Sequence, residues 1–438
     1  MLSRTDAEAL DTTDPLATLR SQFSLPPGVI YLDGNSLGAL PVATGARLQQ
    51  VVTREWGQSL IGGWNGHEGE VGWIELPRRV GDKIARLVGA GPGELIVADS
   101  TSVNLYKVLA AALALVQDAE AASGAVRRRT VLTEISNFPT DLYIAAALAA
   151  DRGFDLKCVA SEALTANLDE HAAVLLLTHV NYRNGRLHDM AALSAAAHAA
   201  GALAIWDLAH SAGAVPVELK RDGADFAIGC GYKYLNGGPG APAFVWVDPR
   251  HASLARQPLA GWMGHAAPFA FTPDYIPAAG SARFLCGTPP VLSLAALECG
   301  IDTVLAAEAH GGMAALRRKS LVLTRLFAAK VQAECPALRV VSPEADAERG
   351  SQVCLSPATG FEACAWPVVQ ALIARGVVGD FRAGDASPGA DPQDILRFGF
   401  TPLYLRHVDA WDAAEQLRQV LDSGQWRQPS FAQRQGVT

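Results

Sequence analysis

The chain has 438 residues, of which 50% are hydrophobic and 18% are charged, a composition typical of a folded protein and not of a disordered one. At roughly 100–200 residues per domain, this length predicts two or three domains. The 36 basic and 44 acidic residues give a net charge of −8, without a basic run. This balance argues against nucleic acid or an anionic membrane as a partner.

The cysteines and the N-terminus favour a cytoplasmic protein. Seven cysteines are scattered without a C-x-x-C pair, so neither a disulfide framework nor a zinc or other metal site is expected. The first residues, MLSRTDAEALDTTDPL, include acidic residues where a signal peptide needs a basic start and an apolar run. The longest uncharged stretch, 190–206, is broken by Gly201 and is interpreted as helix, turn and strand, not as a membrane span.

From a predicted amphipathic helix at 77–89 onward, short apolar runs alternate with helical patterns. Most of the runs are continuously apolar, as buried parallel strands are. The predicted strands are 95–99, 130–135, 173–180, 202–207, 226–230 and 243–247. The predicted helices between them are 102–117, 139–151 and 189–200. This alternation predicts an α/β fold whose mostly parallel central sheet is flanked by helices.

The pattern changes after about residue 290. Two long helices, four short strands and a final helix are predicted there, in the order 291–308, 311–334, 338–342, 351–355, 377–382, 394–399 and 407–423. This mixture predicts a smaller α+β domain. We therefore expect an N-terminal segment, 1–60, that packs on the small domain, a large domain, 61–290, and a small C-terminal domain, 291–438.

The strongest local signal is Lys233, within the segment GCGYKYLNGGPG at 229–240 that follows a predicted buried strand. Burial lowers the pKa of an amine and frees it to bond covalently with a carbonyl group. The glycines would let the backbone approach a bulky cofactor. Taken alone, however, the segment fits a surface lysine in a turn better.

Asp207 ends a predicted strand 26 residues before Lys233, so both would lie at the carboxyl edge of one sheet, where open α/β sheets bind ligands. Pyridoxal phosphate needs such a pair. The lysine bonds to the cofactor, and the carboxylate keeps the pyridine nitrogen protonated so that the ring accepts electrons. By itself Asp207 could equally cap a helix, and His210 is more often structural.

Two further segments fit the same cofactor. Residues 99–104, DSTSVN, follow a strand and open a helix, where hydroxyls and free amides bind a phosphate dianion. An ordinary helix cap is the alternative. Phe138 follows the next strand and could stack on the cofactor ring, although such a residue is more often part of the core. Only the order of the phosphate seat, the phenylalanine, the aspartate and the lysine makes them informative.

With these elements placed, the chain resembles the kynureninases, fold-type-I pyridoxal-phosphate hydrolases with an aspartate-aminotransferase-like fold, and in particular the bacterial kind. The similarity extends from YLDGNSLG at 31–38 to TPLY at 401–404. It rests on the motifs FPTD at 138–141, DLAH at 207–210, YKYLN at 232–236 and GWMGH at 261–265. The resemblance implies a homodimer with shared active sites that cleaves L-kynurenine to anthranilate and L-alanine in tryptophan catabolism.

The resemblance also implies roles for single residues. Lys233 would hold the cofactor and take the substrate α-proton, and Asp207 would pair with the pyridinium nitrogen. Tyr232 would bond the phosphate and help proton transfer, and His210 would lie beside the ring hydroxyl. The other implied cofactor contacts are Thr101, Ser102, Phe138, Pro139, Thr140, Asp141 and Thr178, with Trp262 and Thr288 contributed by the neighbouring subunit.

Arg397, Trp64 and Asn35 would bind the substrate. An arginine fork matches a carboxylate, although without the resemblance Arg397 fits a surface salt bridge equally well. Trp64 and Gly287 leave no partner for a ring hydroxyl, and a buried unpaired hydroxyl costs roughly 1–3 kcal/mol. The sequence therefore predicts a preference for L-kynurenine over 3-hydroxykynurenine.

Two alternatives stay open at this point. The first is another fold-type-I enzyme, such as a cysteine desulfurase or an aminotransferase. A desulfurase needs a reactive thiol on a loop, whereas Cys335 and Cys354 lie in ordinary helix and strand surroundings. The second is a cofactor-binding protein without catalysis, against which the presence of Lys233 and Arg397 argues. The pathway that consumes anthranilate, whether tryptophan catabolism with NAD biosynthesis, quinolone synthesis or siderophore synthesis, is also left open.

Overall fold

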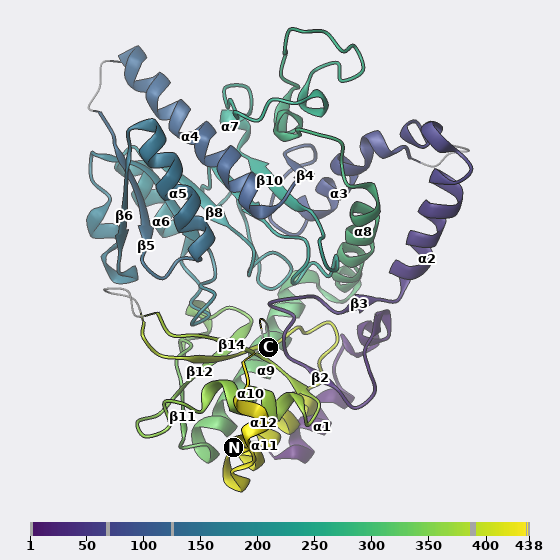
Figure 1. Cartoon of the computed structure of the whole chain (residues 1–438), viewed down its shortest axis with the longest axis vertical. Coiled ribbons are helices and arrows are strands. Elements are labelled where there is room, and N and C mark those ends of the chain that lie inside the picture. Colours follow the sequence, from purple (N-terminus) through teal and green to yellow (C-terminus); the bar gives the residue numbers. More distant parts are fainter. Residues whose placement is uncertain (1–2, 67–70, 124–126, 386–390, 435, 437–438) are drawn as a thin grey trace.

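The computed structural model describes residues 3–66, 71–123, 127–385, 391–434 and 436. It has a large lobe built on a seven-stranded sheet and a small lobe built on a four-stranded sheet, one above the other in Figure 1. Here the large lobe means residues 76–305, and the small lobe means residues 312–432.

The sheet of the large lobe has the order β4-β10-β9-β8-β7-β5-β6. Its strands are β4 (Leu95–Ala98), β5 (Thr130–Glu134), β6 (Asp155–Val159), β7 (Ala172–Thr178), β8 (Leu203–Asp207), β9 (Phe226–Gly229) and β10 (Ala243–Val247). β10 runs opposite to the other six strands, which are parallel to one another. The predicted mostly parallel sheet and its six predicted strands are confirmed. The edge strand β6 was missed because its side chains are partly or fully exposed and carry no continuous apolar run.

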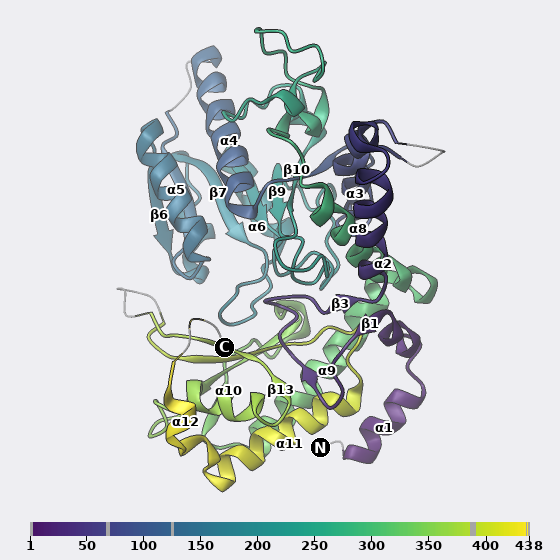
Figure 2. The ribbon, with the colours of Figure 1, turned by 45° about the vertical axis from the view of Figure 1, so that its right-hand side comes forward.

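Helices cover both faces of this sheet, because successive residues of a strand point to opposite sides. Ile205 packs in the core under α4 (Thr101–Ser123) and α5 (Pro139–Arg152), which lie together on one face (Figure 2). Trp206 packs in the core on the other face. The helices on that face are α3 (Leu76–Ala85), α6 (Met190–Ala199) and α8 (Val291–Leu305).

The small lobe carries an antiparallel sheet of order β11-β12-β15-β14. Its strands are β11 (Leu338–Val340), β12 (Gln352–Pro357), β14 (Asp380–Arg382) and β15 (Ile395–Gly399). Its helices are α9 (Gly312–Glu334), α10 (Ala365–Ile373) and α11 (His407–Ser423). The predicted small α+β fold is confirmed, and sequence reasoning missed the helices α10 and α12 (Pro429–Ala432).

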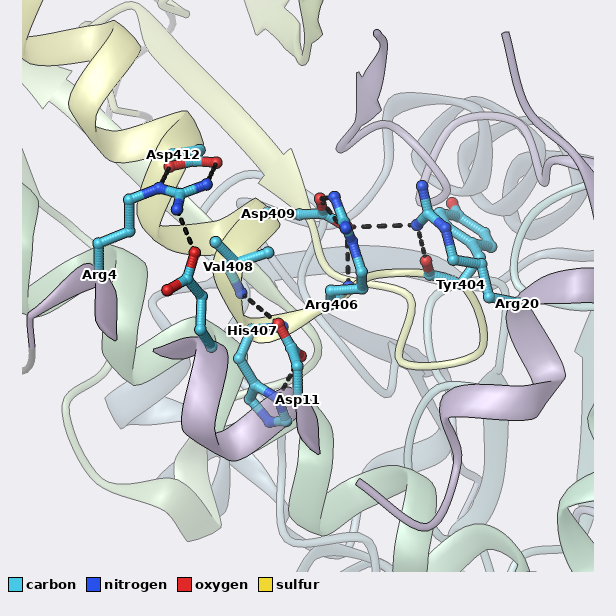
Figure 3. Close-up of polar contacts among 10 residues, drawn as sticks. Arg4, Asp11, Arg20, Tyr404, Arg406, His407, Val408, Asp409 and Asp412 are labelled. Atoms are coloured by element: carbon cyan, nitrogen blue, oxygen red, sulfur yellow. Dashed lines mark hydrogen bonds and ion pairs between the residues drawn. The ribbon is translucent and has the colours of Figure 1, made fainter. Parts of the chain in front are cut away.

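The N-terminal segment attaches to the small lobe at two places. Strand β2 (Ile30–Tyr31) pairs in parallel with β13 (Val377–Val378). Helix α1 (Arg4–Thr12) lies on α11, as Figures 2 and 3 show, and Arg4 forms an ion pair of 2.8 Å with Asp412. Asp11 accepts hydrogen bonds from the backbone amides of His407 and Val408, at the positive end of the α11 dipole (Figure 3).

The remaining N-terminal helix, α2 (Ala43–Gln50), instead packs on α8, which itself contacts α3 of the large lobe. The divisions at residues 60 and 290 stay predictions. In the described parts of the chain, every helix is too short or too polar to cross a membrane.

Candidate active site

A cavity lies at the carboxyl edge of the large sheet, where β4, β5, β7, β8 and β9 end. These five strands are parallel to one another, so the loops that follow them meet at one edge, as the sequence predicts. The cavity is lined by Thr101, Ser102, Phe138, Thr140, Asp141, Thr178, Tyr182, Asp207, Ala209, His210, Tyr232 and Lys233. Ten of these residues are predicted site residues, and Tyr182 and Ala209 are additional.

Lys233 lies in the loop after β9, with Nζ 2.9 Å from Nε2 of His210. Burial lowers the pKa of Lys233, and the positive charge of Arg397 adds to this effect. The loop is held from the N-terminal segment, because the amide of Gly38 donates to the Tyr232 carbonyl at 2.7 Å. A Cβ at Gly38 would lie 2.4 Å from the Lys233 carbonyl oxygen, so only glycine fits there. The site therefore holds a partly buried lysine whose amine gives up its proton more readily than an exposed lysine does.

Asp207 is the last residue of β8 and is 3% exposed. Its Oδ1 accepts a hydrogen bond of 2.7 Å from the Ala209 amide. Asp141, in the first turn of α5, shares a hydrogen bond with it, so two carboxyl groups are buried side by side. Burial and the negative charge of Asp207 raise the pKa of Asp141 well above its usual range. Burial also raises the pKa of Asp207, but nearby Lys233 opposes this shift. Asp141 therefore carries the proton and Asp207 the charge.

The predicted phosphate seat is the start of α4, where Thr101 and Ser102 both line the cavity. The chain turns sharply at Asp99 and Ser100, just before this helix, and Asp99 has a left-handed φ of +45°. The buried amine of Lys107 holds this turn, because it pairs with Asp99 and donates to the Phe284 carbonyl at 2.6 Å. Sequence reasoning missed Lys107, since a single lysine in a long apolar helix gives no signal for a loop contact.

The aromatic and hydroxyl groups complete the cavity wall. Phe138 is 39% exposed and therefore not a core residue, and its ring centroid lies 5.9 Å from Nζ of Lys233. It contacts the Tyr182 ring edge-to-face at 5.3 Å. Thr178 donates to Asn137, which in turn accepts from the Phe138 amide at 2.7 Å and so fixes the loop after β5. Pro139 begins α5 next to Phe138 but does not line the cavity.

These groups match pyridoxal phosphate in their chemistry. A helix start with hydroxyls suits the phosphate. A buried carboxylate suits the pyridine nitrogen, an exposed aromatic face suits the ring, and a neutral amine suits the aldehyde. The cavity in this chain therefore contains one fitting group for each part of the cofactor.

Arg397 lies on β15 and is 1% exposed. Its Nε and Nη2 donate to Asp380, Nη2 also donates to Ser36 at 2.9 Å, and Nη1 donates to the Tyr182 carbonyl at 2.9 Å. Arg397 thus forms a buried ion pair with Asp380 beside Tyr182 of the cavity wall, and it is not part of a surface salt bridge.

Sequence reasoning missed the neighbours of Arg397. Asp380 also pairs with Arg382, at 2.7 Å. Burial and the charge of Asp380 raise the pKa of Asp33 to about 7. Two arginines and two carboxyl groups therefore gather beside the cavity. The spacing D-F-R at 380–382 could have suggested this cluster, because alternate residues of a strand share one face.

Besides Pro139 and Arg397, four predicted residues lie outside the Lys233 cavity. Trp64 and Trp262 contact each other, with ring centroids 5.7 Å apart, in an aromatic cluster that includes Phe269. Thr288 lines a separate cavity with Ser100 and Tyr232. Asn35 is fully buried, and neither its amide nitrogen nor its oxygen has a hydrogen-bond partner among the described residues. No contact within the described parts of this single chain tests the roles predicted for these four residues.

A mostly parallel sheet whose carboxyl edge carries a buried lysine, a buried aspartate and a hydroxyl-lined helix start defines a pyridoxal-phosphate enzyme of fold type I. Solved structures have the same fold. A cysteine desulfurase from Thermococcus onnurineus NA1 has a TM-score of 0.76 at 18% identity, covering 93% of this chain and 98% of that one. A C-DES variant with glycine linked covalently to the PLP cofactor has a TM-score of 0.74 at 16% identity, covering 91% and 98%. At such identities the likeness shows the fold alone.

Comparison of sequences is more specific. Residues 316–417 match the family model of the kynureninase C-terminal domain. The chain is 52% identical to the kynureninase of Burkholderia pseudomallei (strain 1106a) over 443 residues, which cover 100% of both proteins. It is also 52% identical, with the same coverage, to a kynureninase of Pseudomonas fluorescens. This chain therefore belongs to the kynureninase family.

The proton assignment within the carboxyl pair gives a test. Because the pKa of Asp141 is raised on folding, its contribution to stability is full below its unfolded pKa of about 3.9 and is lost as the pH rises through the folded value. Asparagine does not ionise, so Asp141→Asn removes this loss of stability at high pH. The cofactor-free variant should unfold at the wild-type temperature or above it at pH 7–8, and this advantage should vanish near pH 4. Thermal unfolding at several pH values measures it.

Asp207→Asn is the matched variant, because it removes the charge instead of the proton. It should weaken binding of pyridoxal phosphate by about a hundred-fold or more, as expected when a buried charged partner is lost. Equilibrium titration with the cofactor measures this change. An Asp141→Asn protein that is less stable at pH 8 than at pH 4, relative to wild type, would contradict the assignment.

Proposed function

We propose that the Lys233 cavity hydrolyses L-kynurenine to anthranilate and L-alanine with pyridoxal phosphate as cofactor. The observation that carries the proposal is the buried amine of Lys233, placed at one sheet edge with Asp207 and the start of α4, in a chain that is 52% identical to kynureninases over its full length. Family membership supports the substrate, and the cavity supports the chemistry.

When bound, the cofactor supplies an electron sink for the bond-breaking steps. Lys233 takes the α-proton at Nζ, which suits an amine whose pKa is lowered by burial. Asp207 stays ionised and keeps the pyridine nitrogen protonated. Burial raises the pKa of Tyr232, so its phenol keeps a proton that it can pass to the β-carbon. Water adds to the γ-carbonyl and supplies the hydroxyl group of the anthranilate carboxyl, the β–γ bond breaks, and only then does the β-carbon take the Tyr232 proton to give alanine.

We propose that Arg397 binds the substrate α-carboxylate. Asp380 holds the edge of the guanidinium formed by Nε and Nη2, which fixes the plane of the fork. Nη1 faces the carbonyl of Tyr182, a residue of the cavity wall. A carboxylate entering beside Tyr182 would meet this end of the fork, where it can form charge-assisted hydrogen bonds.

The desulfurase alternative is not favoured. Burial raises the pKa of both Cys335 and Cys354 to about 12, and inert buried thiols cannot accept sulfur from a substrate. The desulfurase-like structures share the fold at 18% identity or less in the two comparisons above, whereas the full-length relatives at 52% identity are kynureninases.

We infer a cytoplasmic location and a role in tryptophan catabolism through the kynurenine pathway, connected with NAD biosynthesis. The seven cysteines are free, which suits a reducing compartment.

Lys233→Ala should abolish the visible absorption of the bound cofactor together with anthranilate formation, because the covalent link and the base are lost together. Lys220→Ala is the control, since Lys220 lies on the surface in an ion pair of 2.8 Å with Glu94. Absorption spectra and anthranilate fluorescence of the two purified variants measure the result. Turnover by Lys233→Ala at the wild-type rate would disprove the proposed role.

The ring pocket should favour L-kynurenine over 3-hydroxykynurenine in kcat/KM by roughly ten- to a hundred-fold, the cost of leaving a buried hydroxyl unpaired. Trp64 offers only one indole N–H on a bulky apolar ring and Gly287 has no side chain, and a Cβ at Gly287 would meet no atom within 4 Å. Steady-state kinetics with both substrates decide the matter. Equal or reversed values would contradict the role of these two residues.

We propose a homodimer in which Trp64 and Trp262 reach the active site of the neighbouring copy. Both lie in an aromatic cluster outside the Lys233 cavity of their own chain. The apolar side chains exposed near them in sequence are Trp56, Leu60, Ile61, Phe269, Phe271 and Ile276. Exposed apolar surface of this extent is typical of an interface between subunits.

Complementation tests this sharing. Lys233→Ala and Trp64→Ala chains, purified together through two different tags, form a heterodimer in which one site lacks both residues and the other has both. Each homodimer should be strongly impaired, whereas the heterodimer should regain roughly half of the wild-type activity, since one of the two symmetric sites is intact. A heterodimer without restored activity would show that Trp64 serves the site of its own chain.

A further inference from the structure

Gln352 links the small lobe to the active-site histidine. It is the first residue of β12, is 1% exposed and reaches across to the large lobe. Its Nε2 donates to the carbonyl oxygens of Asn181 and Tyr182, at 3.1 and 3.3 Å. Its Oε1 lies 3.1 Å from Nδ1 of His210. Sequence reasoning did not single out Gln352.

These contacts fix the orientation of the Gln352 amide. A backbone carbonyl only accepts hydrogen bonds, so the group facing Asn181 and Tyr182 must be the NH₂ group. The carbonyl oxygen Oε1 must then face His210. Because Oε1 also only accepts, the hydrogen between the two side chains belongs to Nδ1 of His210.

The other ring nitrogen follows from this assignment. His210 is buried, and its burial together with the positive charges of Arg397 and Arg382 lowers the pKa of the ring and opposes its protonation. A neutral imidazole has a single N–H. Since Nδ1 carries it, Nε2 is unprotonated and accepts a hydrogen bond from Nζ of Lys233, 2.9 Å away.

We propose that Gln352 is a positioning residue that holds His210 in the Nδ1–H tautomer, so that Nε2 stays a fixed acceptor for the amine of Lys233. This inference rests on the proposed function, in which Lys233 is the nucleophile and the base. It adds to that function a residue of the small lobe that determines where the proton of the histidine resides.

The tautomer matters for the chemistry of the amine. When Lys233 donates a hydrogen to Nε2, its lone pair points away from His210 and is free to attack or to take a proton. After Nζ has taken the substrate α-proton, the ammonium still has an acceptor in Nε2. In the opposite tautomer, Nε2–H would donate to the amine and occupy its lone pair. A histidine held in the wrong tautomer loses much of its catalytic value.

Gln352 also makes the tautomer depend on the docking of the lobes. Its Nε2 is held by residues of the loop after β7, in the large lobe, while its backbone belongs to the small lobe. Separation of the lobes would remove Oε1 from His210 and leave the ring free to choose either tautomer. The active amine is therefore formed only in the docked arrangement.

The experiment is ¹⁵N NMR of the full-length protein with labelled histidine, with and without pyridoxal phosphate and in the absence of kynurenine. The signal of His210 is assigned by its loss in His210→Asn. In the wild type, Nδ1 should show the shift of a protonated ring nitrogen and Nε2 that of an unprotonated one. The reverse pattern would overturn the proposal, and this measurement needs only the wild type and the His210→Asn variant to fold.

The variants are Gln352→Met and Arg183→Met. Methionine has the length of glutamine without its hydrogen bonds. Arg183 links the same loop to the small lobe through the carbonyls of Ala383 and Gln393, each at 2.7 Å, without touching His210. Gln352→Met should shift His210 towards the Nε2–H tautomer and lower kcat by roughly ten- to a hundred-fold with little change in KM, the size of one lost buried hydrogen bond.

Arg183→Met should keep the wild-type tautomer. An unchanged tautomer in Gln352→Met, or the same shift in both variants, would refute the assigned role and leave Gln352 as a docking contact. The tautomer is measured without substrate, so failure to form anthranilate would count against the proposed function and not against this inference.

Discussion

The site depends on the cost of burying a primary amine. A charged Lys233 would be strongly disfavoured in the cavity, and burial lowers its pKa so that a neutral amine becomes accessible. The charge that remains in the cavity is that of Asp207, which has the backbone amide of Ala209 and the proton of Asp141 as partners. A negative charge held this way favours a cationic pyridinium ring beside it. One physical constraint thus accounts both for the reactive lysine and for the carboxyl pair.

The same constraint explains why the small lobe docks through backbone carbonyls. Arg183 donates to carbonyls of residues 383 and 393, Gln352 to those of 181 and 182, and Arg397 to that of 182. Carbonyl acceptors satisfy buried donors without adding a formal charge near Lys233. A carboxylate in their place would stabilise the ammonium form and raise the pKa of the amine. The lobes are therefore joined tightly without loss of the neutral lysine.

Much of the fold could be predicted from the sequence, because buried parallel strands are continuously apolar and their carboxyl ends gather the loops that follow them. This reasoning located Lys233, Asp207 and the start of α4 correctly at one edge. It missed β6, whose exposed side chains give no apolar run. It also missed Lys107 and Gln352, each of which reaches a distant partner, 177 and 142 residues away in the chain. Contacts between single polar residues over such separations leave no periodic pattern.

The cluster around Arg397 shows what substrate binding must rearrange. Asp380 already neutralises one of the two arginines, and Asp33, with a pKa raised to about 7, carries only part of a charge near neutral pH. The α-carboxylate of an amino-acid substrate would bring a further negative charge next to Asp33. Since like charges raise the pKa of a carboxyl group, Asp33 would take up a proton as the substrate binds. The two arginines would then be balanced by Asp380 and the substrate, so that the cluster becomes electrically neutral only when the site is filled.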